Sequence, residues 1–142
     1  MKIRLVIISI LLSICSAVFA SERPLQELRA EAAKASPKDQ PKLYVEIAQR
    51  ELKDIEALYK EGDSEKGKQA LEQLTADCEN AAKASKTIRK RMKQTEISLR
   101  QIGERMNDLQ RSAAFDDRPP LKAALDRIEQ ARTTLLDAMF SK

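Results

Sequence analysis

The chain has 142 residues, enough for one domain, and its 26 Lys and Arg face 22 Asp and Glu, a net charge of +4. It contains no His and no Trp, so acid–base catalysis would fall to carboxylates, Lys, Tyr or Cys. Strong helix formers dominate and β-branched residues do not alternate as in strands, so the composition predicts an all-α protein.

The first twenty residues have the pattern of a secretory signal peptide. Lys2 and Arg4 precede an uncharged apolar run over residues 5–20, and Ala20 stands where a signal peptidase expects a small residue. The alternative is an uncleaved anchor, but the run is shorter than the ~20 residues of a spanning helix. We therefore expect cleavage at about Ala20 and an exported protein, periplasmic or extracellular. Without this segment 24 bases face 22 acids, so the net charge falls to about +2 and gives no global case for nucleic acid or a membrane as a partner.

Three stretches rich in helix breakers divide the remaining chain. They are residues 36–41, 60–65 and 115–120. They predict helices over about residues 22–35, 40–61, 63–114 and 118–140. Asp39, Asp63 and Asp117 are the expected N-caps, and Gly62 is expected to take a left-handed conformation at the end of the second helix. The predicted domains are a signal peptide (1–20), a short helix with a linker (21–38) and a helical-hairpin or coiled-coil domain (39–142).

The segment at 63–114 carries a heptad seam. Alternating steps of three and four residues connect Leu71, Leu74, Cys78, Ala81, Ser85, Ile88, Met92, Thr95, Leu99, Ile102, Met106, Leu109 and Ala113. No Pro interrupts it, which predicts one long helix with coiled-coil-like packing. The second helix is expected to fold back over residues 64–84 and the last helix over about 92–113, with residue 118+k opposite 113−k. The middle of the long helix would then be sparsely covered.

That middle contains a basic segment, which we define as residues 83–93. Its cations are Lys83, Lys86, Arg89, Lys90, Arg91 and Lys93, with no acid between residues 80 and 95. One interpretation is a solvated coiled-coil surface whose long side chains cover the seam. Another is a docking site for an acidic partner or an anionic envelope lipid. Glu27 and Glu31 of the first helix are a possible internal partner.

No pattern in the sequence predicts catalytic chemistry, a cofactor or a metal. Asp116 and Asp117 are explained by a turn before a helix, and residues 63–65 lack the oxygen spacing of a calcium loop. Cys78 has no His to activate it, and its place on the seam predicts a small buried residue. Since Cys78 is the one cysteine after residue 20, no internal disulfide is expected.

Residues 57–74, "ALYKEGDSEKGKQALEQL", resemble one helix–turn–helix of tetratricopeptide repeats, with a Gly-Asp turn and the small residue Gly67 early in the second helix. The resemblance covers a single hairpin, and no second copy follows at the spacing of 34 residues that such repeats have. It therefore predicts this hairpin and no repeat array.

Together these patterns predict a non-enzymatic exported helical module for binding or scaffolding in the periplasm or cell envelope. We expect a protein partner, no nucleic acid, and a monomer in preference to a homodimer, because each end of the long helix has an intramolecular partner. The alternative is a holdase-like chaperone or a binder of anionic surfaces, including membranes, that uses the basic segment and the exposed seam.

Overall fold

A computed structural model describes residues 23–141, which form helices and no strand. The elements are α2 (Leu25–Lys34), α3 (Gln40–Lys60), α4 (Ser64–Lys86), α5 (Arg89–Ser112), the 3-10 turn η1 (Phe115–Asp117) and α6 (Arg118–Phe140). The all-α class is confirmed. The predicted signal peptide lies outside the described residues, and none of the helices within them is long and apolar enough to cross a membrane.

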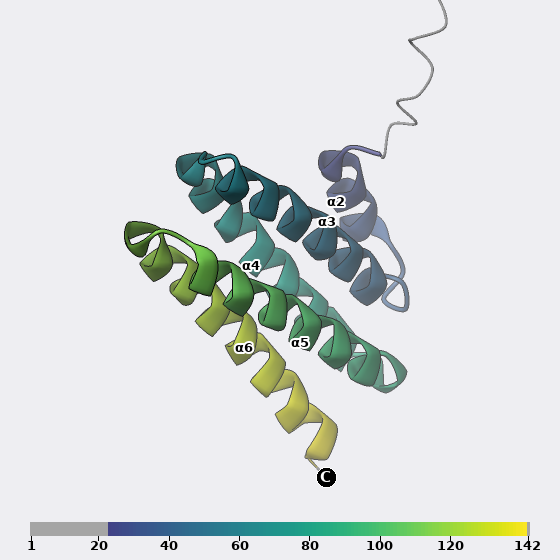
Figure 1. The fold of residues 1–142 in the computed structure, drawn as a ribbon. Helices are drawn as coiled ribbons and strands as arrows, with labels where there is room; N and C mark the ends of the chain where they lie inside the picture. The colour runs from purple at the N-terminus through teal and green to yellow at the C-terminus, as the bar shows by residue number, and fades with distance from the viewer. Residues whose placement is uncertain (1–22, 142) are drawn as a thin grey trace, which may run out of the picture.

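Four of the helices form an antiparallel bundle. In Figure 1, α3, α4, α5 and α6 run alternately in opposite directions, and α2 lies beside α3 at the edge. Both α3 and α6 pack against α4, and α6 also packs along α5. The predicted antiparallel placement of the second helix on 64–84 and of the last helix on 92–113 is therefore confirmed.

The predicted long helix over 63–114 is wrong, because the chain reverses direction between α4 and α5. Thr87 ends α4, and Ile88 has an extended backbone with φ −131° and ψ 94°. The Thr87 hydroxyl donates to the Ala84 carbonyl at 2.7 Å, which satisfies one of the free acceptors at the end of α4. Two successive β-branched residues have low helix propensity, and the reversal lets α5 pack within the bundle instead of extending into solvent.

Most of the apolar seam is buried although it is shared between two helices; Ile88, Leu109 and Ala113 are half-buried. The spacing of three and then four residues from Ser85 to Ile88 and Met92 continues through the turn, so the periodicity gives no sign of the break. Ser85, Met92 and Thr95 are all buried, and the expectation of a sparsely covered middle is wrong. The largest core side chains include Leu52, Ile55, Leu74, Leu99, Ile102, Met106, Leu121, Ile128 and Leu135.

The turn between α3 and α4 is built as the sequence predicts. Gly62 has φ +83°, and the Asp63 side chain accepts the backbone N–H of Lys66 at 3.4 Å as the N-cap of α4. Asp39 and Asp117 occupy the N-cap positions of α3 and α6 without a capping hydrogen bond. Each of these helices has a proline in its first turn, and because proline has no backbone N–H, one fewer donor there needs a capping group.

Gly67 brings α3 and α4 close together. A Cβ atom at this position would lie 2.7 Å from Cε2 of the Tyr59 ring, so the ring occupies the space that any larger residue would need. The small residue in the predicted hairpin is therefore a packing requirement of the interface between these two helices.

The register of α6 on α5 agrees with antiparallel counting from the turn. A Cβ atom at Gly103 would lie 2.5 Å from Oε1 of Glu129, one residue from the counted partner of position 129. Near the other end, the Arg89 guanidinium donates to the Ser141 carbonyl at 3.5 Å. The C-terminal end of α6 therefore lies beside the first turn of α5.

The first helix, α2, is packed on the bundle. Its buried residues Leu28 and Ala32 form a small cluster with Ile47 of α3. Because α2 has few large apolar residues, this cluster alone buries little surface, and an ion network described below adds to it.

Candidate anion-binding surface

The basic segment lies at one end of the bundle, around the turn from α4 to α5. Lys83 and Lys86 belong to the last turn of α4, and the four other cations belong to the first two turns of α5. All are exposed except the half-buried Arg91. The chain reversal at Thr87 and Ile88 therefore gathers these side chains at a blunt end, whereas a single helix would have spread them along its middle.

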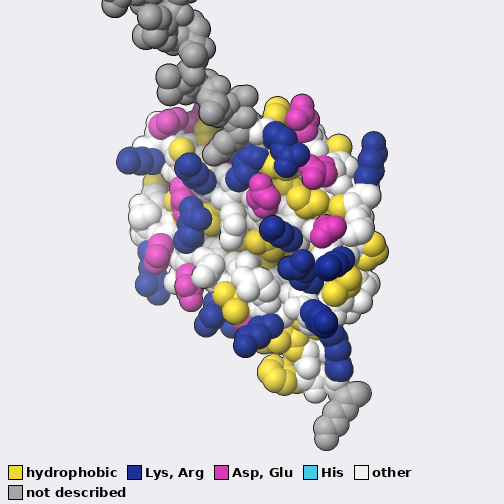
Figure 2. All heavy atoms as spheres, turned by 90° about the vertical axis from the view of Figure 1, so that its right-hand side faces the viewer, with side chains coloured by type: hydrophobic (Ala, Val, Ile, Leu, Met, Phe, Trp, Pro, Cys, Tyr) yellow, Lys and Arg dark blue, Asp and Glu magenta, His cyan; other side chains and the backbone are white. Residues whose placement is uncertain are grey.

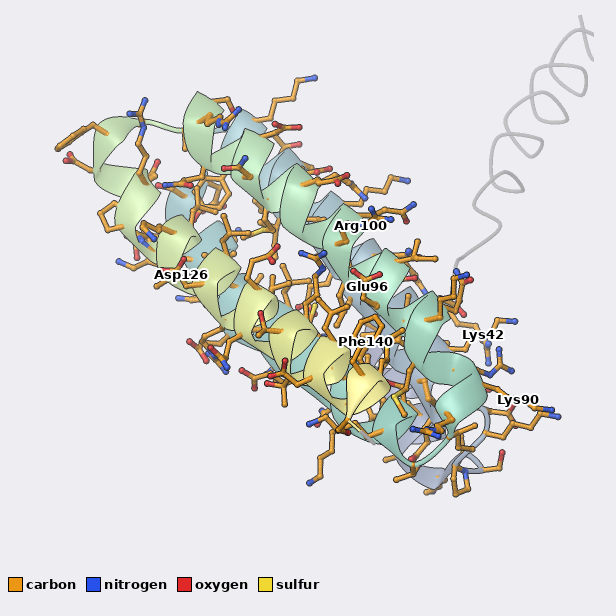
Figure 3. All side chains as sticks on the ribbon, turned by 90° about the horizontal axis from the view of Figure 1, so that it is seen from below. Lys42, Lys90, Glu96, Arg100, Asp126 and Phe140 are labelled. Atoms are coloured by element: carbon orange, nitrogen blue, oxygen red, sulfur yellow. The ribbon has the colours of Figure 1, made fainter. Side chains whose placement is uncertain are left out.

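The connection between α2 and α3 adds cations to the same end. Figure 3 shows Lys42, in the first turn of α3, and Lys90, at the start of α5, at the same end of the bundle. Exposed Lys34, the last residue of α2, and exposed Lys38, in the loop that follows, lie close to Lys42 in the sequence. We define the basic end as Lys34, Lys38, Lys42, Lys83, Lys86, Arg89, Lys90, Arg91 and Lys93.

The six cations of the basic segment have no carboxylate partner among residues 23–141. No Asp or Glu of this range lies within 4.0 Å of their charged nitrogens, and Arg89 bonds a backbone carbonyl. The predicted internal partner is wrong, since Glu31 pairs with Arg23 at 2.6 Å and Glu27 reaches no base of the segment. The nearby Asp39 instead accepts a hydrogen bond from Ser36 at 2.7 Å.

Three arginines in the body of the bundle are surrounded differently. Each bridges helices by bonding carboxylates: Arg105 with Glu56, Arg127 with Glu72 and Glu79, and Arg132 with Glu96 and Glu129. Their N–O distances lie between 2.5 and 3.2 Å. These three arginines are therefore neutralised within the bundle, whereas the six cations of the basic segment are not.

The start of α5 strengthens the positive potential of this end. Its N-cap, Ile88, supplies no side-chain hydrogen bond, and its first turn contains no acid. Because the N-terminus of a helix carries about half a positive charge, cations there are unfavourable for folding and favourable for attracting an anion.

A groove of about 480 Å³ runs between α3 and α5 next to this surface. Lys42 and Arg91 line it from the two helices, together with the amides of Gln49 and Gln94 and the carboxylate of Glu46. It combines hydrogen-bond donors with cations and holds no nucleophile paired with a base. Its chemistry suits recognition of anionic groups.

A second charged cluster, buried under α2, was not predicted. The Arg29 guanidinium bonds Glu51 of α3 at 2.6 Å and Asp77 of α4 at 3.1 and 3.3 Å. Glu51 and Asp77 are 6% and 3% exposed, so the network joins three helices away from water. The signal in the sequence was Glu51 itself, which lies between Ile47 and Ile55 on the apolar face of α3.

The Glu51 carboxyl group is strongly perturbed by this environment. Its pKa is raised to about 7, chiefly by burial and also by the neighbouring Asp77, against the opposing attraction of Arg29. One guanidinium facing two carboxyl groups leaves an excess negative charge, which favours a proton on one of them. Since Arg29 of α2 bonds both carboxyl groups, the docking of α2 explains the cluster.

The other residues considered for chemistry in the sequence have structural explanations. Cys78 is fully buried as predicted, and burial raises the pKa of its thiol above the usual range. Asp116 and Asp117 lie in η1 at the turn into α6. Within residues 23–141 no three His, Cys, Asp or Glu side chains are grouped as metal ligands would be.

Comparison with known proteins gives no relative from which a function could be inferred. No protein-family model matches the chain, and neither a curated protein nor a solved structure is significantly similar to it. The fold and the charges of the described residues are therefore the basis for a functional proposal.

Proposed function

We propose that this protein is an exported, non-enzymatic helical binding module that docks an anionic partner through its basic end. The observation that carries the proposal is the lack of carboxylate partners for the six cations of the basic segment among residues 23–141, in a bundle that pairs its other interhelical arginines. Like charges held together at a blunt end repel one another, so a partner of opposite charge would relieve an unfavourable interaction.

Two features of the bundle favour docking as a monomer. Most of the seam is covered within the chain, so no continuous apolar heptad face is left for a coiled-coil partner. Cys78 is buried in the core, where a second copy cannot approach its sulfur. We expect the exported protein to run as a monomer in non-reducing electrophoresis, and a dimer band that vanishes with reductant would contradict this part of the proposal.

A holdase-like chaperone is less well supported than docking through charge. That alternative depended on a sparsely covered seam that could hold unfolded chains, and most seam residues are buried, with Ile88, Leu109 and Ala113 half-buried. Export remains part of the proposal and rests on residues 1–20; N-terminal sequencing of the exported protein is expected to begin at Ser21.

Binding to a soluble polyanion tests the proposal. The chain from Ser21 onward contains the whole described bundle, and poly-L-glutamate supplies anionic charge without a specific shape. We expect binding that weakens steeply with salt, because exposed charges are screened within about 8 Å at physiological ionic strength.

A matched pair of variants locates the binding surface. Replacing Lys90 and Lys93 by Gln removes two charges from the basic end, whereas replacing Lys60 and Lys68 by Gln removes two exposed charges at the opposite end. We expect the first variant to bind poly-L-glutamate about tenfold more weakly and the second to change affinity less than about twofold. Equal losses would mean that net charge alone drives binding and that the basic end is not a site.

A further inference from the structure

An exposed aromatic side chain lies beside the basic end. Phe115 and Phe140 are the large hydrophobic residues most exposed in the described chain, at 82% and 79%. Phe140 is the last residue of α6, and the carbonyl of the next residue, Ser141, accepts the hydrogen bond from Arg89. Phe115 lies in η1, at the other end of α6.

The surface around this residue combines charge with apolar groups. In Figure 2, Lys and Arg side chains gather in the lower right of the face shown, with hydrophobic side chains beside them, whereas acids are more frequent higher up. Half-buried Ile88, Leu136 and Met139 are apolar residues of the same end. Exposed Asp137 lies one turn before Phe140, and Arg89 reaches the carbonyl of the residue after it, so the ring has charges of both signs nearby. An aromatic ring left in water by its own helix is unfavourable in isolation.

We propose that the anionic partner of the basic end is the surface of a lipid bilayer, met end-on, with Phe140 inserting between the headgroups. This inference rests on the proposed function and names its partner. Aromatic rings favour the interface between headgroups and acyl chains, and Lys and Arg beside them are attracted to anionic headgroups.

The distribution of the cations favours a flat partner. They come from α2 and the start of α3 with the loop between them, from the last turn of α4 and from the start of α5, whereas the last turn of α6 contains no base. An extended acidic peptide would be matched by a stripe of bases along one groove. A bilayer surface can contact all of these side chains at once, and it offers Phe140 an apolar layer that a polyanion in water lacks.

Vesicle co-sedimentation with the chain from Ser21 tests the charge component. We expect binding to vesicles of phosphatidylglycerol and phosphatidylcholine in equal parts, and little binding to phosphatidylcholine alone. Replacing Lys90 and Lys93 by Gln is expected to weaken binding about thirtyfold, since each base near an anionic surface contributes roughly a factor of five. The variant with Lys60 and Lys68 replaced by Gln is the control and is expected to bind nearly as the parent does.

Tryptophan fluorescence tests the insertion of Phe140. Because the sequence contains no Trp, a Phe140→Trp variant carries a single reporter, and Phe115→Trp is its matched control at the other end of the bundle. We expect a blue shift with anionic vesicles for Phe140→Trp and none for Phe115→Trp. Phe140→Ala is expected to weaken vesicle binding about tenfold, and Phe115→Ala less than about twofold. Melting curves of all four variants show whether the fold is retained.

The outcomes separate this inference from the proposed function. Binding to poly-L-glutamate without binding to anionic vesicles would overturn the lipid partner and leave an acidic protein as the partner of the basic end. Failure to bind either would overturn both proposals. Vesicle binding with equal blue shifts at positions 140 and 115 would show that Phe140 does not anchor the contact.

Discussion

The network under α2 and the basic end use the same side-chain chemistry in opposite surroundings. Arg29 is bonded by two carboxyl groups that are almost fully buried, whereas the six cations of the basic segment face solvent with no described carboxylate within reach. A buried ion pair stabilises one arrangement of helices, because removing one partner leaves the other charge buried without a counter-charge. An exposed charge without a partner adds little to folding and remains available for binding.

The largest effect is expected where the buried network loses its cation. Arg29→Met would keep much of the apolar stem but leave Glu51 and Asp77 facing each other without a counter-charge. We expect the free energy of unfolding to fall by about 3–5 kcal/mol. Arg105→Met is the control, since it removes an exposed pair with Glu56 and is expected to cost less than about 1 kcal/mol. Urea denaturation of both variants checks this, and similar losses would show that the network does not hold α2.

The second effect concerns the pH dependence of the same network. The pKa of Glu51 is raised from 4.5 to about 7 in the folded protein, so its contribution to stability is complete below pH 4.5 and is lost as the pH rises through about 7. Glu51→Gln cannot ionise. Between pH 5 and pH 8 we therefore expect the free energy of unfolding to fall by about 1–3 kcal/mol less in the variant than in the parent.

Thermal unfolding at these two pH values measures the difference. Glu56→Gln is a suitable control, because Glu56 lies on the same helix and its pair with Arg105 is exposed. A parent and a Glu51→Gln variant with the same pH dependence would mean that Glu51 is ionised throughout this range.

The smallest expected effect is a gain in stability, and it comes from a substitution at the basic end. Lys90→Glu places an acid in the first turn of α5, next to the positive end of the helix dipole and among cations. We expect it to stabilise the fold by about 0.3–1 kcal/mol while weakening binding to anionic vesicles. A variant that is destabilised would show that Lys90 has a structural role. This would remove the contrast between the two regions.

Much of the fold could be predicted from local signals in the sequence, and the errors of that prediction have identifiable causes. The breakers around Gly62 and before Pro119 predict two turns correctly, because each contains a residue with a special backbone requirement. The turn at Thr87 and Ile88 contains no Gly or Pro, and the apolar spacing passes through it unchanged. The available signal was a pair of consecutive β-branched residues next to a run of cations. β-branched residues are poorly suited to a helix interior, and cations are poorly suited to a helix start.

The sequence predicted which residues make up the candidate site but not where in the fold they lie. The six cations of the basic segment are recognisable from the sequence, but their gathering at the end of a bundle depends on the chain reversal. The proximity of Phe140 and the α2–α3 connection depends on tertiary packing that no local pattern contains. The network of Arg29 was missed because its three members are 22 and 26 residues apart in turn, and only Glu51 departs visibly from the pattern of its helix.

The account depends most directly on the reversal at Thr87 and Ile88, since a continuous helix would scatter the basic end. Spin labels at cysteines replacing Lys68 and Asp108, both exposed, measure it in a background with Cys78 replaced by Ser. In one straight helix these positions would be about 60 Å apart at 1.5 Å per residue. In the bundle both lie far from the turn on neighbouring or diagonal helices, and we expect a separation below about 30 Å. A distance distribution centred near 60 Å would contradict the account.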